Sequence, residues 1–221
     1  MNMLRRYTTG IALLLTGLAV LWCCGCSGSA AGTVGPYSYP SINDVPNLIR
    51  LPLTRQATDH TCGVASLQSI LFYYGLEIRE DNLAVELHTT IDGTPYWNMV
   101  SFAKSQGFEV SVATNLTLDD LRKNIDLRRP VLVAIQAWMN PPVDWSTYDE
   151  GHYVVVVGYD AANFYFMDPS TLGHYTYIPI TEFLARWHDM GADGTHLAQF
   201  GIVMTKVPAV PYDPDRITRM D

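Results

Sequence analysis

The chain has 221 residues, of which 48% are apolar and 11% aromatic, so it is large enough for one packed domain and unlike a disordered chain. Its formal net charge is −8, and no run of Lys or Arg occurs anywhere. Nucleic acid is therefore not expected as a partner, because affinity for it depends on basic side chains that neutralise phosphates.

Residues 1–31 have the composition of an export signal or of an N-terminal lipid or membrane anchor. Two arginines precede an apolar run from residue 11 to residue 22, and small residues follow. The run is shorter than the roughly 20 apolar residues of a membrane span. Cleavage near Ala30 and retention of a lipidated N-terminus are the two alternatives. The cysteines available for lipidation are Cys23, Cys24 and Cys26.

An exported protein is expected from this segment, either secreted or anchored outside the cytoplasm, with membrane contact only through the N-terminus. Residues 32–50 are rich in Pro, Gly and Ser and are predicted to form a tether. Residues 51–207 form the predicted domain, and the prolines in residues 208–221 indicate a C-terminal tail. The predicted domain has one cysteine, Cys62, which excludes a disulfide scaffold.

Three helices are predicted at the start of the domain. The first begins near Cys62, carries an apolar stripe with three- and four-residue spacing, and ends at Gly75. A short helix capped by Asp81 follows, and a third runs from about residue 96 to residue 106. The candidates to cap the first helix are Thr58, Asp59 and Thr61. The apolar residues of the second and third helices are Leu83, Val85, Leu87, Met99, Phe102 and Ala103.

Alternating and consecutive apolar residues predict strands downstream of residue 107. These strands cover residues 108–112, 131–137, 153–159, 163–167, 175–178 and 199–204. Short helices are expected after Thr117, with Asp120 in a capping box, and over residues 181–188. The residues of this last helix expected to face inward are Phe183, Leu184 and Trp187. Helices followed by strands with short links predict an α+β fold, with N-terminal helices packed on a mostly antiparallel sheet.

Cys62 is the candidate nucleophile because it opens a predicted helix. The positive end of the helix dipole stabilises a thiolate, which is the reactive form of cysteine. A small buried apolar residue is the alternative interpretation, since free cysteine is among the most buried residue types.

His152 and Asp168 are the candidate base and its orienting acid. His152 opens the strand that contains four consecutive valines, and Asp168 ends the next strand. Two antiparallel strands joined by a tight turn bring the end of the second beside the start of the first, so these side chains are predicted to meet. An Asp-Pro turn is the alternative explanation of Asp168. Of the other histidines, His60 is close enough in sequence to share the cleft of Cys62. Those expected to face solvent are His88, His174, His188 and His196.

Gln56 is the fourth candidate and lies six residues before Cys62. A side-chain amide beside the backbone N–H of Cys62 would donate to an oxyanion that develops during acyl transfer. An ordinary polar loop residue is the alternative interpretation.

Taken in order, these motifs resemble the bacteriocin-processing, double-glycine leader peptidase family, whose members are papain-like cysteine peptidases. The resemblance rests on Gln-x5-Cys-Gly opening a helix, Gly-His-Tyr-Val-Val-Val-Val-Gly-Tyr-Asp and Met-Asp-Pro, over roughly residues 50–205. It implies a papain-like fold and a peptide or protein substrate, cut after small residues such as Gly-Gly. It also implies the roles of four residues: nucleophile Cys62, base His152, orienting acid Asp168 and oxyanion-hole residue Gln56. The sequence departs from many members at Thr61, where they have Asp, and it lacks the ATP-binding loop of the exporter-fused members.

A stand-alone, exported thiol hydrolase is the favoured interpretation. A papain-like transpeptidase, amidase or transglutaminase-like enzyme would use the same acyl-enzyme with another acceptor. A surface module that binds extended peptides in an aromatic cleft would need no nucleophile. The aromatic residues considered for that cleft are Trp97, Trp138, Trp145 and Tyr148. No cofactor is expected, and no metal either, because the paired ligand spacings of zinc sites are missing around Cys62.

Overall fold

The computed structural model describes residues 40–138, 143–208, 212–217 and 219. The compact unit that these residues form begins at Pro40. The predicted export signal or anchor and residues 32–39 of the predicted tether lie outside the described residues. Within the described ranges, no helix is long and apolar enough to cross a membrane.

The chain forms helices and strands in an order close to the predicted one. The helices are η1 Ile42–Asp44, α1 Cys62–Tyr73, α2 Glu80–Glu86, α3 Tyr96–Ser105, α4 Leu118–Asp126 and α5 Ile180–Arg186. The strands are β1 Glu109–Ala113, β2 Val131–Gln136, β3 Gly151–Tyr159, β4 Asn163–Met167, β5 Thr176–Pro179 and β6 Gly201–Thr205. The predicted α+β fold is confirmed.

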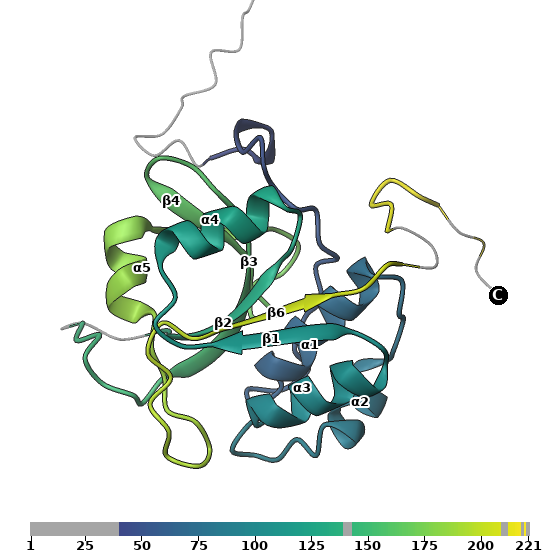
Figure 1. Cartoon of the computed structure of the whole chain (residues 1–221), viewed down its shortest axis with the longest axis horizontal. Helices are drawn as coiled ribbons and strands as arrows, with labels where there is room; N and C mark the ends of the chain where they lie inside the picture. Colours follow the sequence, from purple (N-terminus) through teal and green to yellow (C-terminus); the bar gives the residue numbers. More distant parts are fainter. Residues whose placement is uncertain (1–39, 139–142, 209–211, 218, 220–221) are drawn as a thin grey trace, which may run out of the picture. The chain divides into compact units, whose positions relative to one another are not determined.

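The six strands form one sheet in the order β1-β6-β2-β3-β4-β5, and every neighbouring pair is antiparallel. Helices α1, α2 and α3 gather toward one end of this sheet, while α4 and α5 lie toward the other (Figure 1). Because β3 and β4 are consecutive and antiparallel, the end of β4 returns toward the start of β3. The start of β3 and the end of β4 are therefore neighbours, and the candidate active site lies there.

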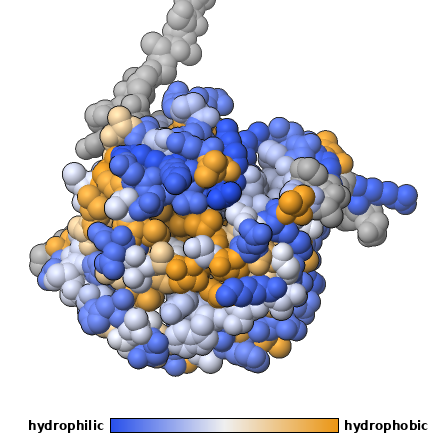
Figure 2. Space-filling view, viewed as in Figure 1, coloured by the Kyte–Doolittle hydropathy of each residue, from blue (hydrophilic) through white to orange (hydrophobic). Residues whose placement is uncertain are grey.

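The core lies between the helices and the central strands. All of β2 is buried, and so are the four consecutive valines of β3, as expected of strands that are covered on both faces. Helix α4 buries Leu121 and Ile125, and its other face is polar, so hydrophilic residues gather over α4 in Figure 2. The predicted capping box of Thr117 and Asp120 is confirmed.

Residues 45–51, within and just after the predicted tether, pack against the sheet. Val45 and Ile49 are buried, and the Ile49 N–H donates to the carbonyl of Val157 in β3 at 2.7 Å. This segment therefore contributes to the core before the chain reaches Cys62.

Several local predictions are wrong because the chain satisfies its polar groups elsewhere or turns a side chain outward. Asp81 does not cap α2: the N-cap is Arg79, and the Asp81 carboxylate lies 2.7 Å from the Arg79 guanidinium. Val85, whose orientation the sequence analysis leaves open, is 73% exposed, because it lies two residues from each of the buried residues Leu83 and Leu87, about half a turn around the helix. Leu184 of α5, predicted to face inward, is 43% exposed, because it lies at the edge of the face that buries Phe183 and Trp187.

Candidate active site

Cys62 is the first residue of α1, as predicted, and its side chain is partly exposed. The predicted side-chain cap is wrong. No side-chain oxygen of the described residues caps α1, because Thr61 Oγ1 accepts from the Thr58 N–H and donates to the Thr58 carbonyl instead. The first N–H groups of the helix are therefore left free at the thiol, where they favour negative charge.

Two contacts hold the start of α1 against β3. Ser66 Oγ donates to the carbonyl of Tyr153 at 3.0 Å. Gly63 packs so tightly that an added Cβ would lie 3.2 Å from both Thr94 Cβ and the Tyr153 ring. Since Tyr153 directly follows His152, these contacts bring Cys62 beside the histidine.

His152 and Asp168 meet as predicted. His152 is 2% exposed, and its Nε2 lies 2.8 Å from Asp168 Oδ1. The Asp168 carboxylate also accepts from the N–H and hydroxyl of Ser170 and from the hydroxyl of Thr171, at 2.8 to 3.1 Å. A carboxylate with this many donors is an acceptor only, so Nε2 carries the proton and Nδ1 is the basic nitrogen of the neutral ring.

The surroundings stabilise the charged forms of both side chains. Burial lowers the pKa of His152, but hydrogen bonds to Asp168 and Cys62, together with their negative charge, raise it to about 9. Burial raises the pKa of Asp168, but the hydrogen bond and charge of His152 and the donors of Ser170 lower it to about 2. The site therefore favours an imidazolium beside a carboxylate near neutral pH.

The contact between Cys62 and His152 is looser than the contact between His152 and Asp168. The thiol influences the ring as a hydrogen-bond partner, yet Nδ1 is buried and has no partner of good hydrogen-bond geometry among the described residues. Catalytic hydrogen bonds are often long before substrate binds. A buried basic nitrogen beside a thiol is the arrangement that activates a cysteine nucleophile.

Gln56 lies on the loop that leads to Cys62. Its backbone N–H donates to the carbonyl of Pro169, which follows Asp168, so the loop is tied to the acid side of the site. Its side-chain Nε2 donates to the Thr58 carbonyl at 2.8 Å, and Oε1 is buried without a hydrogen-bond partner among the described residues. One N–H of the amide is thus already used, and the oxyanion-hole role remains a prediction.

Cys62 opens onto a cleft of about 560 Å³. Its lining residues include Cys62, Thr94, Tyr148, Gly151, Tyr153 and Asp189. Of the four aromatic residues predicted to line a peptide cleft, Tyr148 alone does so among the described residues. Trp138 instead packs on the His152 ring at 4.3 Å between centroids, and Trp145 lies against the guanidinium of Arg186.

The other histidines lie outside this cleft lining. His188 is half-buried rather than solvent-facing, because its Nε2 lies 3.0 Å from the carbonyl of Thr147 and its ring packs on Tyr148. Within the described part of the chain, no three His, Cys, Asp or Glu side chains come together as metal ligands. The sequence did not single out Asp189, because it follows α5 in a segment without periodicity.

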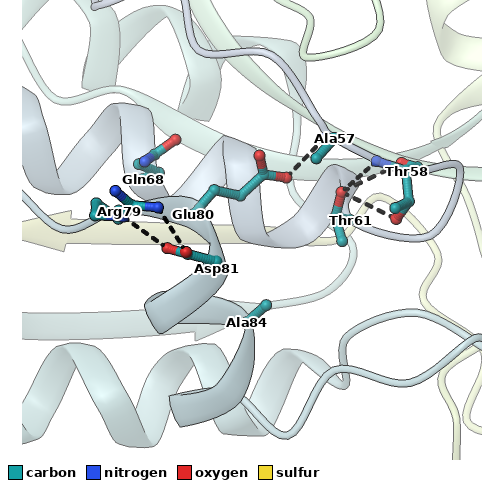
Figure 3. Close-up of a pocket in the computed structure, with 8 residues that line it drawn as sticks. All are labelled: Ala57, Thr58, Thr61, Gln68, Arg79, Glu80, Asp81 and Ala84. Atoms are coloured by element: carbon teal, nitrogen blue, oxygen red, sulfur yellow. Dashed lines mark hydrogen bonds and ion pairs between the residues drawn. The ribbon is translucent and has the colours of Figure 1, made fainter.

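A second hollow, of about 610 Å³, lies between α2 and the loop before Cys62 (Figure 3). Glu80 reaches across it, and its Oε1 accepts from the N–H of Ala57 at 2.9 Å. Helix α2 therefore supports the loop that carries Gln56.

Comparison with known proteins shows the family and the fold of this chain. The sequence matches the Peptidase C39-like family over residues 48–195. The chain belongs to this family. Among curated relatives, the C39-like region is 28% identical over 165 residues to the transport/processing ATP-binding protein ComA of Streptococcus pneumoniae. That alignment covers 73% of this chain but only 19% of ComA.

Solved structures of C39-like domains share the fold. The peptidase domain of Streptococcus ComA has a TM-score of 0.53 at 23% identity, covering 71% of this chain and 97% of that domain. A putative C39-like peptidase from Bacillus anthracis has a TM-score of 0.55 at 19% identity, covering 73% and 96%. The double glycine motif protease of an AMS/PCAT transporter, solved with its leader peptide, has a TM-score of 0.51 at 19% identity, covering 71% and 92%. The predicted papain-like C39 fold is thereby confirmed.

Proposed function

We propose that this C39-like protein is an exported cysteine peptidase that hydrolyses peptide bonds. The observation that carries the proposal is the buried His152, hydrogen-bonded to Asp168 on one edge and left with an unpartnered Nδ1 on the side of Cys62. An imidazole that is held by a carboxylate and faces a thiol at a helix N-terminus has the parts of a thiol hydrolase.

In the proposed mechanism, the Cys62 thiolate attacks the carbonyl carbon of the scissile peptide bond. The free N–H groups at the start of α1 and the amide of Gln56 stabilise the oxyanion. The imidazolium of His152 then gives its proton to the leaving amine, and the acyl-enzyme forms. Water attacks the acyl group while His152 accepts its proton, which releases the acid product and restores the Cys62 thiolate and the His152 imidazolium. Asp168 keeps the ring oriented throughout.

The substrate class is proposed from the family. A related double glycine motif protease was solved with its leader peptide, which supports a peptide as the ligand of the cleft. The double glycine motif of that related protease supports a preference for small residues such as Gly-Gly before the cut. Export remains part of the proposal and rests on the composition of residues 1–31.

The test is a peptide-library digest with the wild-type protein and Cys62→Ala side by side, read by mass spectrometry. We expect cleavage products with the wild type and none with Cys62→Ala. A labelled amine in the same digest distinguishes hydrolysis from transfer, since a transpeptidase would attach the amine to the new carboxyl end. Equal products from both proteins, or none from either, would refute the proposed peptidase.

A further inference from the structure

Asp189 is a carboxylate of the Cys62 cleft that the proposed mechanism does not use. It lies at the base of a hairpin that is closed by backbone hydrogen bonds, from Leu197 N–H to the Asp189 carbonyl and from Gly191 N–H to the Thr195 carbonyl, both at 2.8 Å. The position of Asp189 in the cleft is therefore set by the fold rather than by a free loop.

The orientation of this carboxylate is also fixed. Oδ1 accepts from the Met190 N–H at 2.8 Å and from Gln136 Nε2 at 3.1 Å. Gln136 is fully buried, and its Oε1 accepts from the Glu150 N–H, so the amide cannot turn away. Among the described residues, Oδ2 of Asp189 has no hydrogen-bond partner, which leaves one carboxylate oxygen for a ligand.

Gly151, the residue before His152, makes room for the carboxylate. A Cβ on Gly151 would lie 2.6 Å from both oxygens of Asp189, closer than atoms can approach. The Asp189 carboxylate thus occupies the space of a missing side chain next to the base of the site. A substrate group bound by Asp189 would lie in the cleft onto which Cys62 opens.

No Lys or Arg side chain lies beside Asp189 among the described lining residues of the cleft. The other carboxylates of the cleft, Asp92 and Asp149, are exposed. Burial raises the pKa of Asp189 to about 6, while the hydrogen bonds of Met190 and Gln136 and the nearby His188 and His152 act in the opposite direction. A buried carboxylate with an incomplete set of partners gains most from a cationic ligand.

We propose that Asp189 is a specificity-determining residue that binds a positively charged group of the substrate, an ammonium or a guanidinium, next to the scissile bond. This inference rests on the proposed function, because it takes the cleft to be the peptide site. The charge has two sources, the side chain of a Lys or Arg residue and the free α-amino group of a peptide that is cut near its N-terminus. This preference for a positive charge is separate from the proposed preference for small residues before the cut, because it concerns another position of the substrate.

The test uses short fluorescent peptide pools and the full chain carrying Cys62→Ala, so that binding is measured without cleavage. Each pool has a blocked N-terminus and holds either Arg or its neutral analogue citrulline at one position among Gly and Ala. A matched set has a free N-terminus. By fluorescence anisotropy near neutral pH, we expect Arg or free-amine pools to bind about 10-fold more tightly than neutral blocked pools.

Adding Asp189→Asn should reduce this ratio to about 1, because Asn keeps the acceptor for Met190 and Gln136 but loses the charge. Gly151→Ala, which displaces the carboxylate, should reduce the ratio independently if Asp189→Asn does not fold. Glu86→Gln is the matched control: it removes one negative charge from an exposed position of α2 outside the cleft lining, and the ratio should change less than about 2-fold.

Three outcomes overturn the role of Asp189. They are a ratio of charged-pool to neutral-pool affinity near 1 in the Cys62→Ala protein, a ratio that is unchanged by both Asp189→Asn and Gly151→Ala, and no binding by any pool. Failure of the wild type to cut any peptide, with the Asp189-dependent ratio intact, refutes the peptidase instead. Tighter binding by the blocked Arg pools would identify a side chain as the source of the charge. Tighter binding by the free-amine pools would identify the α-amino group.

Discussion

The two halves of the candidate site are built differently. In the half that contains His152 and Asp168, the strand register brings the two together, and four hydrogen bonds converge on the Asp168 carboxylate. In the half that contains Gln56 and Cys62, no side chain in the described part of the protein caps the helix start, and the Gln56 Oε1 is buried there without a partner. The fold therefore satisfies the hydrogen bonds of the half that determines the charge of His152 (the completed half). It leaves unused hydrogen-bonding groups in the half that receives the substrate (the open half).

The largest expected effect comes from removing the base from the completed half. His152→Ala deletes both the proton acceptor and the imidazolium that supports the thiolate, so turnover should fall by more than about 10⁴-fold. Alkylation of Cys62 by iodoacetamide near neutral pH should slow to the rate of a free model thiol. His174→Ala, at an exposed position, is the control and should leave both rates unchanged. Wild-type labelling rates in His152→Ala would show that the two halves are not coupled.

Asp168→Asn tests the charge of the completed half while keeping its shape. The pKa of His152 is raised to about 9, so the imidazolium exists at neutral pH and is lost as the pH rises through about 9. Without the Asp168 charge this pKa falls, and the alkaline limb of kcat/KM should move to lower pH. Turnover near neutral pH should fall by about 10²- to 10⁴-fold.

The same pair also makes stability depend on pH, with a sign that can be checked in thermal unfolding. The raised pKa of His152 means that its contribution is full below its ordinary value of 6.5 and is lost as the pH rises through about 9. The lowered pKa of Asp168 means that its contribution is full above 3.8 and is lost as the pH falls through about 2. Asp168→Asn should weaken the pH dependence of the unfolding temperature at both its acid and its alkaline end. An unchanged dependence on pH would contradict the ion pair of His152 and Asp168.

Gln56→Ala tests the open half. Loss of one oxyanion donor typically lowers turnover by about 10²- to 10³-fold, and KM should change little because the donor acts on the transition state. Cys62 alkylation should keep its wild-type rate, since iodoacetamide forms no oxyanion. A loss confined to KM, or slower alkylation, would assign Gln56 to substrate binding or to the support of the thiol instead.

The difference between the halves also explains what the sequence could predict. The meeting of His152 and Asp168 follows from two consecutive strands, because an alternating pattern and a short turn determine which ends lie together. The helix α1 follows from its apolar periodicity, although the side-chain cap from which its start near Cys62 is predicted does not form. Both are local patterns, and the structure agrees with them.

The parts that escaped prediction depend on contacts between segments distant in sequence. Asp189 enters the cleft through Gln136 and Gly151, on strands β2 and β3, and neither contact leaves a periodic signal. Thr61 is one of the three predicted capping candidates of α1, but its hydroxyl instead forms hydrogen bonds with the backbone of Thr58. Composition indicates which groups are available, and only the tertiary fold decides how they pair.

The smallest expected effect comes from Glu80, which supports the loop of Gln56 but does not itself contact the reacting atoms. Glu80 Oε1 accepts from the Ala57 N–H, next to Gln56, so Glu80→Ala should loosen the oxyanion loop without touching the reacting atoms. The net worth of one such hydrogen bond predicts a loss in kcat of about 3- to 10-fold with KM nearly constant. Glu80→Gln retains an acceptor oxygen and should recover most of this loss.

Asp81→Asn is the matched control, because it breaks the exposed pair with Arg79 on the same helix and leaves the loop untouched (Figure 3). Recovery by Glu80→Gln with no effect of Asp81→Asn would locate the loss in the hydrogen bond to Ala57. An equal loss in Asp81→Asn would mean that α2 acts through its overall charge. A loss in Glu80→Ala that appears in KM would place Glu80 on the path of the substrate, because a loop that only positions the oxyanion donor affects the transition state more than the bound substrate.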